Sequence, residues 1–254
     1  VLANKYTLWV YNHELNFMKE IVLRLKGKWI NGVDIALNGQ NELVIAGYVN
    51  GSRDFGINAS FSLLLDSKYD PKKVNYNKFT KEDFAKFVSV KDIDKIKSLE
   101  DFYLRDLVML DDGSFYLLGE MYYKFVDRTY DPRTNVTATT DHYNYNSIIV
   151  NYFDKNGNLK WNEHIPKFQN SIDDYGFYSS YSWINLGDKI GLFYNGNEKN
   201  LELSVTDYIN HKDLFNNRRH AHTYVILNSE GVVKRSKLND NKTSFVLYPK
   251  QSFS

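Results

Sequence analysis

The chain has 254 residues, of which 43% are hydrophobic, and its formal net charge is +1. A charge so close to zero gives no long-range attraction to nucleic acid or anionic lipid, so we expect neither as a partner. Cysteine is absent, which excludes disulfide bonds and thiolate metal sites. No apolar run reaches the roughly 20 residues that a transmembrane helix needs.

Strand-like segments start at the first residues and continue along the chain. Residues 5–26 predict one hairpin, and pairs of hairpins follow over residues 29–79, 102–166 and 178–239, with a last strand over 244–248. The turn residues Gly113 and Gly187 lie 74 residues apart, as do Gly157 and Gly231. The sequence therefore predicts four-stranded antiparallel units that repeat at about 74 residues.

The apolar runs alternate little between apolar and polar residues, as residues 43–48 and 148–153 illustrate. Strands that are apolar throughout are buried on both faces. Radially stacked sheets cover each other, whereas a sandwich leaves one face of each sheet in water. We therefore expect an all-β, β-propeller-like fold with these units as blades. Residues 1–254 would form a single domain that is part of a larger chain.

Two segments lengthen the repeat. Residues 127–146 are polar and predict a long loop. Residues 80–100 predict a short helical insert, because Thr80 and Asp83 resemble a capping box. An apolar stripe with a spacing of three residues follows, formed by Val90, Ile93, Ile96 and Leu99.

Candidate binding residues occur in three segments, 161–169, 178–181 and 193–200, and close to them. They are Glu120, Lys167, Gln169, Asp173, Asp174, Asn195, Asn197 and Asn200. Two interpretations stay open: the amide side chains bond backbone groups and lock the loops, or they form a shared binding face. We expect no catalytic residues, because the common hydrolase, phosphate-loop and metalloprotease motifs are absent from the sequence.

Calcium is a metal that the sequence leaves open. Adjacent carboxylates such as Asp173 and Asp174 can bind it. The segment from Asp154 to Gly157 begins like a calcium loop, but it is better explained as a hairpin turn in which Gly157 has a positive φ. We therefore expect no cofactor and no metal site, with calcium at the turn carboxylates as the alternative.

Three short motifs carry a resemblance to known proteins. Asp112-Gly113 is followed by Glu120 and Tyr122-Tyr123, the turn from Gly157 to Trp161 leads to Ile165-Pro166-Lys167-Phe168-Gln169, and an Asn-rich stretch spans 193–197. With these motifs, residues 5–254 resemble a group of uncharacterised bacterial envelope proteins with β-propeller-type repeats. The resemblance implies an exported protein, in the periplasm or at the cell surface, and implies no activity.

Our functional hypothesis is a non-enzymatic binding or scaffold module, a protein-interaction subunit of a membrane-associated cell-envelope assembly. Repeat architecture, long loops and missing catalytic motifs all favour it. The alternative is a carbohydrate-binding or carbohydrate-active propeller. Exposed Tyr and Trp side chains can stack on sugars, and Glu120, Glu163 and Asp174 could pair as glycosidase carboxylates.

Overall fold

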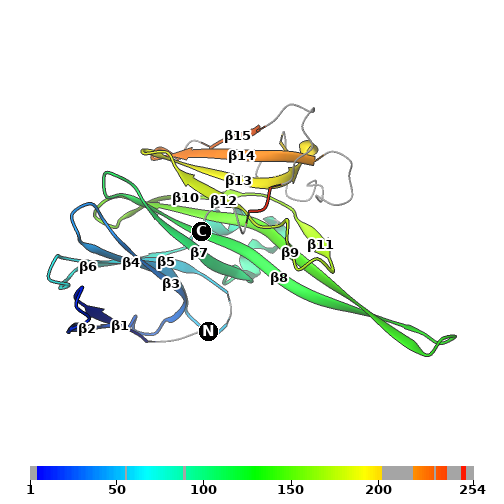
Figure 1. Ribbon diagram of the computed structural model, residues 1–254, viewed down its shortest axis with the longest axis horizontal. Coiled ribbons are helices and arrows are strands. Elements are labelled where there is room, and N and C mark those ends of the chain that lie inside the picture. The colour runs from blue at the N-terminus through cyan, green and yellow to red at the C-terminus, as the bar shows by residue number, and fades with distance from the viewer. Residues whose placement is uncertain are drawn as a thin grey trace. The chain divides into compact units, whose positions relative to one another are not determined.

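The structure is a computed structural model that describes residues 5–54, 56–87, 90–201, 220–231, 233–238 and 247–249. Strands dominate these residues, which confirms the all-β class (Figure 1). Within each sheet, strands that follow each other along the chain are neighbours, except that β11 pairs with β9 rather than with β10. This order results from hairpin connections rather than crossovers.

The described residues form four sheets. The first is a hairpin of β1 (Tyr6–Tyr11) and β2 (Phe17–Leu23). The second contains β3 (Trp29–Leu37), β4 (Leu43–Asn50), β5 (Ala59–Leu65) and β6 (Pro71–Lys78). The third contains β7 (Phe102–Met109), β8 (Phe115–Asp131), β9 (Val136–Phe153) and β10 (Leu159–Ile165), with β11 (Asn170–Ile172) paired to β9. The fourth contains β12 (Ser182–Asn185), β13 (Lys189–Asn197), β14 (His220–Asn228) and β15 (Val233–Lys237).

The sheets coincide with the predicted units. The hairpin lies within residues 5–26, and the three larger sheets lie within 29–79, 102–166 and 178–239, except for β11, which belongs to the third sheet but lies outside 102–166. Of the predicted last strand, residues 244–246 fall outside the described residues, and 247–248 are not in a strand.

The chain divides into two compact units. One comprises Val1–Gly119 with Val150–Asn162, and the other comprises Glu120–Ile149 with Glu163–Ser254. The strands β8, β9 and β10 each pass from one unit into the other. In the first unit, Ile21 and Leu23 of β2 pack with Ile30, Phe61 and Leu65 in one hydrophobic core.

The strands β4 and β5 are buried at every position, as their unbroken apolar runs predict. The outer strand β6 is mostly exposed, because its sequence is rich in Lys and Asn. Both strands next to β4 pair with it antiparallel. The sequence pattern therefore distinguishes the inner strands of this sheet from its edge.

The predicted helical insert is confirmed in part. The helix α1 (Lys81–Ala85) starts at a capping box in which Thr80 and Asp83 bond each other's backbone N–H groups. A 3₁₀-helix, η1 (Val90–Lys95), follows. The stripe spacing of three residues is the period of a 3₁₀-helix rather than of an α-helix, which explains why no longer α-helix forms. No helix among the described residues is long and apolar enough to span a membrane.

The prediction of a long loop over residues 127–146 is wrong. The structure extends β8 and β9 through this segment, and only residues 132–135 form the turn between them. Polarity misled the prediction, because four of the five residues from Val136 to Thr140 are β-branched, and such residues favour strands even when they are exposed.

Candidate functional site

The first candidate is a buried ion pair in the second unit. The Lys167 Nζ atom lies 2.7 Å from Glu120 Oε1, and neither side chain is exposed to solvent. The same ammonium donates to the Tyr145 carbonyl oxygen (2.6 Å) and to Gln169 Oε1 (2.9 Å). The buried ammonium thus has two hydrogen-bond acceptors and a carboxylate as its ion-pair partner, and such partners are what a buried charge requires.

Gln169 connects this pair to the segment before β12. Its side-chain amide donates to the carbonyl oxygens of Ser180 (3.3 Å) and Asn195 (2.8 Å), and its Oε1 accepts from Ser180 N (2.7 Å). The Ser180 hydroxyl donates to Glu120 Oε2 at 2.7 Å. Ser180 has a φ of 79°, a left-handed conformation that costs energy for a residue with a side chain. Three hydrogen bonds, two with Gln169 and one with Glu120, hold this conformation in place.

Asn195, on β13, binds two further segments. Its Nδ2 donates to the carbonyl oxygens of Tyr178 and Leu247, both at 2.8 Å, and its Oδ1 accepts from Leu247 N (3.1 Å). One side chain thereby fixes a loop and a distant part of the chain. Amide side chains acting on backbone groups were one of the two interpretations of these segments.

The network is closed to solvent. Glu120, Gln169 and Ser180 are 0% exposed, and Lys167 is 1% exposed. The Ser180 hydroxyl and the Glu120 carboxylate could in principle act as nucleophile and base. In this arrangement, however, no substrate can reach the hydroxyl, because it is fully buried. In this arrangement the groups can hold the 167–182 segment on the sheets, and a ligand would require them to open.

The remaining candidate residues lie elsewhere. Asn197 begins the short 3₁₀-helix η2 (Glu198–Asn200), where its side chain accepts from Lys199 N, and Asn200 is buried at the end of that helix. Asp173 is exposed and Asp174 is partly buried. Their carboxylates accept from the N–H groups of Asp141 and Gly176, both at 2.8 Å. No group of three or more metal-ligating side chains occurs in the described part of the chain.

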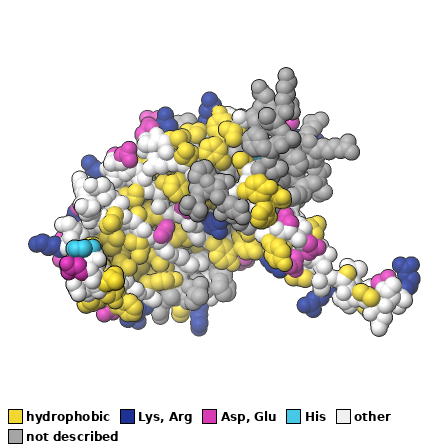
Figure 2. Space-filling model, viewed as in Figure 1, with side chains coloured by type: hydrophobic (Ala, Val, Ile, Leu, Met, Phe, Trp, Pro, Cys, Tyr) yellow, Lys and Arg dark blue, Asp and Glu magenta, His cyan; other side chains and the backbone are white. Residues whose placement is uncertain are grey.

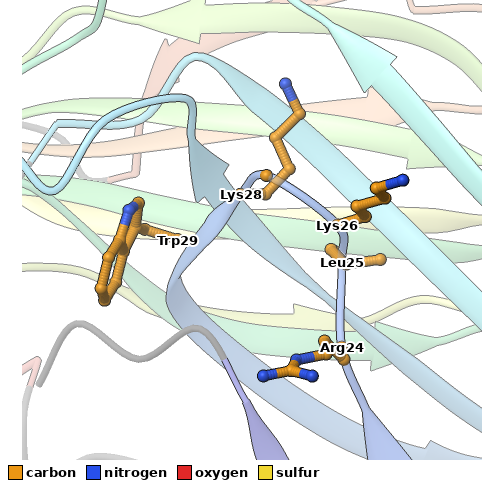
Figure 3. Close-up of a pocket in the computed structure, with 6 residues that line it drawn as sticks. Arg24, Leu25, Lys26, Lys28 and Trp29 are labelled. Atoms are coloured by element: carbon orange, nitrogen blue, oxygen red, sulfur yellow. The ribbon is translucent and has the colours of Figure 1, made fainter.

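A cavity of about 570 Å³ lies beside the loop between β2 and β3, in the first unit. Residues 24–29 line it, among them Arg24, Lys26 and Lys28. Figure 3 shows these three basic side chains pointing in different directions rather than toward one point. The Lys28 ammonium instead lies 4.8 Å from the centre of the Tyr76 ring, a cation–π contact. The loop therefore does not form a convergent anion site.

The second candidate is the outer half of the β8–β9 hairpin, residues 124–140, which we call the arm. It extends beyond β11 as a two-stranded ribbon (Figure 1). All of its residues are exposed except Asp131 and Thr140, which are intermediate. The arm carries apolar side chains, and basic and acidic side chains lie together at its tip (Figure 2). The apolar ones are Phe125, Val126, Tyr130 and Val136, exposed by 42–56%.

Contacts between β8 and β9 stabilise the base of the arm. Lys124 donates to Asp141 Oδ2 at 2.6 Å, and its ammonium lies 5.0 Å from the centre of the Tyr143 ring. The hydrogen bond from Lys124 lowers the pKa of the Asp141 carboxyl, and burial raises the pKa of Tyr143. The Phe125 ring stacks on His142 with centroids 4.4 Å apart. The arm is therefore a formed ribbon at its base.

Sequence reasoning missed the arm as a site. The signal that could have identified it is the run of strand-forming residues from Val136 to Thr140, between Tyr130 and Tyr143. Of the predicted residues, the structure brings Glu120, Lys167, Gln169 and Asn195 together in one buried network. Asn197 and Asn200, like Asp173 and Asp174, make the separate contacts described above.

No protein-family model matches the chain, and no curated protein is significantly similar to it.

Proposed function

We propose that this protein is a non-enzymatic binding module that docks a protein partner through the arm. The main observation that supports this proposal is that a two-stranded ribbon is exposed on both faces and presents four large apolar side chains to water. An isolated hairpin of this kind gains little stability by itself. Exposed apolar groups on a projecting element favour a role in association.

We further propose that the partner belongs to a bacterial cell-envelope assembly and that the protein is exported. The resemblance of the Ile165–Gln169 motif to envelope proteins supports this setting. We also propose that the four-stranded sheets are blades of a propeller that belongs to a larger chain. The burial of β4 and β5 on both faces supports that arrangement, because stacked blades cover each other.

The test is affinity capture from native cells in mild detergent, followed by mass spectrometry. The matched variant replaces residues 127–140 with Asn-Gly, which closes the hairpin with a two-residue turn and leaves the Lys124–Asp141 contact in place. We expect the wild-type protein to retain a stoichiometric envelope partner that the shortened variant loses. The same partner on both proteins, or no partner on either, would contradict the proposal. An unchanged circular dichroism spectrum would establish that the shortened variant is folded.

A carbohydrate-binding function is the second candidate, now supported by a different surface. Trp9, Tyr11 and Phe17 lie on the hairpin of β1 and β2 and are 51–59% exposed. The rings of Tyr11 and Phe17 meet edge to face at 5.9 Å. Such rings can stack on sugars. Glycan-array binding that is lost in Trp9→Ala but kept in the arm-shortened variant would favour this function.

A further inference from the structure

We infer that the arm pairs with the arm of a second copy of this chain, through the free edge of β9 and about a twofold axis at Ala138. This inference rests on the proposed role of the arm in protein association. It names the partner of one edge, and the apolar faces of the arm stay available to other proteins.

The first step is the location of a free strand edge. On the side of β9 away from β8, β10 and β11 cover only the inner part of the strand, and β11 reaches His142. Asp141 is covered as well, because it exchanges hydrogen bonds with Asp173 at 2.8 and 2.9 Å. No other described strand pairs with residues 136–140 on this side.

The second step identifies the backbone groups that this edge presents. Asp141 and Tyr145 direct backbone N–H groups to the side of β11, toward Asp173 and Gln169. Successive residues of an antiparallel strand bond to opposite sides. The N–H and C=O groups of Thr137 and Thr139 therefore face the free side, where two donors and two acceptors are available.

The third step is that the β9 edge lacks the residues that usually prevent an edge strand from pairing with another chain. Edge strands are commonly blunted by charged residues or by proline. The other strand of the arm follows this rule, with Lys124, Asp127, Arg128 and Asp131 within eight residues. From residue 134 to residue 140, β9 and the turn before it carry neither a charge nor a proline. The two edges of the arm thus differ in charge: the β8 edge is charged, whereas the β9 edge is uncharged and is suited to pairing with another strand.

The fourth step shows that a second copy fits this edge. In a twofold register centred on Ala138, Thr137 of each copy faces Thr139 of the other, and the two pairs form four backbone hydrogen bonds. Thr–Thr pairs and the Val136–Thr140 pairs beside them are favourable cross-strand neighbours. The two small Ala138 side chains meet at the axis, where strands approach most closely.

The same register limits the pairing to residues 136–140. Residue 135 of one arm would fall opposite residue 141 of the other, where Asp173 already covers the edge. The pairing therefore ends where the arm tip meets the loop after β11.

Cysteine cross-linking tests the register, because the natural chain contains no cysteine. Ala138→Cys places the two thiols at the axis, within reach of a disulfide bond. Val136→Cys is the matched control: it lies on the same exposed face, but the twofold register separates its two copies by four residues, about 13 Å. We expect mild oxidation to give a disulfide dimer with Ala138→Cys and not with Val136→Cys, and a dimer again with the double variant Val136→Cys/Thr140→Cys.

Light scattering on the unmodified protein gives the second readout. We expect a concentration-dependent dimer that Ala138→Glu converts to a monomer, because two carboxylates would then face each other. Equal cross-linking at positions 136 and 138, or a monomer at every concentration, would overturn the inference. If the protein is monomeric but the shortened variant still loses its envelope partner, this inference fails while the proposed function stands.

Discussion

At the residue scale, the hairpin turns depend on glycine. Gly113, Gly157, Gly187 and Gly231 have φ angles between 73° and 86°. Other residues reach this region only at a cost of about 1–2 kcal/mol. Gly157 has a second constraint, since a Cβ atom there would come within 2.5 Å of Leu64 Cδ1 and 2.7 Å of Ser62 Oγ.

We therefore expect Gly157→Ala to destabilise the protein more than Gly113→Ala. At Gly113 the added methyl group meets only Lys155 at an ordinary 3.6 Å, so the variant loses about 1–2 kcal/mol through backbone strain. At Gly157, overpacking adds about 1–3 kcal/mol. Urea unfolding of both variants measures the difference, and equal losses would show that the close contacts relax freely.

The pair of Glu120 and Lys167 is also a residue-scale feature. Removing one member of a buried ion pair leaves an uncompensated charge and costs about 3–5 kcal/mol. We expect Lys167→Met alone to have this effect. The double variant Glu120→Leu/Lys167→Met should lose much less, because neither charge remains. A double-mutant cycle by denaturant unfolding checks this, and additive losses would contradict the coupling.

At the scale of elements, burial differs sharply along the chain. The strands β4 and β5 are buried at every residue, whereas the arm is exposed on both faces. Local opening is easiest where few apolar contacts hold a segment. The arm is therefore the element best able to adapt to another protein.

Hydrogen exchange should reflect this difference. We expect the amides of β4 and β5 to exchange last and those of residues 124–140 to exchange first, in dilute protein. At high concentration, the amides of Thr137 and Thr139 should gain protection if arms pair. Mass spectrometry at two protein concentrations measures both effects, and fast exchange in β4 would contradict the burial argument.

At the scale of the whole molecule, several carboxylates link stability to pH. Backbone hydrogen bonds from Asp70 and Lys68 lower the pKa of Asp66, and the hydrogen bond from Lys124 lowers that of Asp141. Burial opposes the shift at Asp154, but the hydrogen bonds from Asn158, Lys160 and Asn156 together outweigh it, so its pKa is also lowered. Burial raises the pKa of Asp101, which acts in the opposite sense.

A lowered pKa in the folded state means that the unfolded chain binds the proton more readily. The stabilisation is therefore present above the unfolded value of about 3.8 and is lost as the pH falls through the lower folded value. We expect the melting temperature to fall steeply below about pH 4. Thermal unfolding between pH 2 and pH 7 tests this, and Asp66→Asn should show a smaller fall. A flat profile would exclude these carboxylates as a source of stability.

Much of the strand order could be predicted, because local signals carry it. Turn glycines and unbroken apolar runs located the three larger sheets within a few residues of their ends. The capping box at Thr80 was predicted for the same reason, since its two partners are three residues apart. Polarity, in contrast, predicted a loop where the arm forms, because the few apolar residues of this segment do not alternate regularly with polar ones.

The sequence by itself determined the all-β class and the hairpin order, because turn chemistry and strand preference act over a few residues. Only the tertiary structure decided what the candidate residues do. Lys167 and Gln169 are as polar as any surface pair, and their burial against Glu120 and Ser180 depends on segments 47 and 11 residues away in the chain. The free edge of β9 was likewise decided in three dimensions, since it depends on where β11 ends.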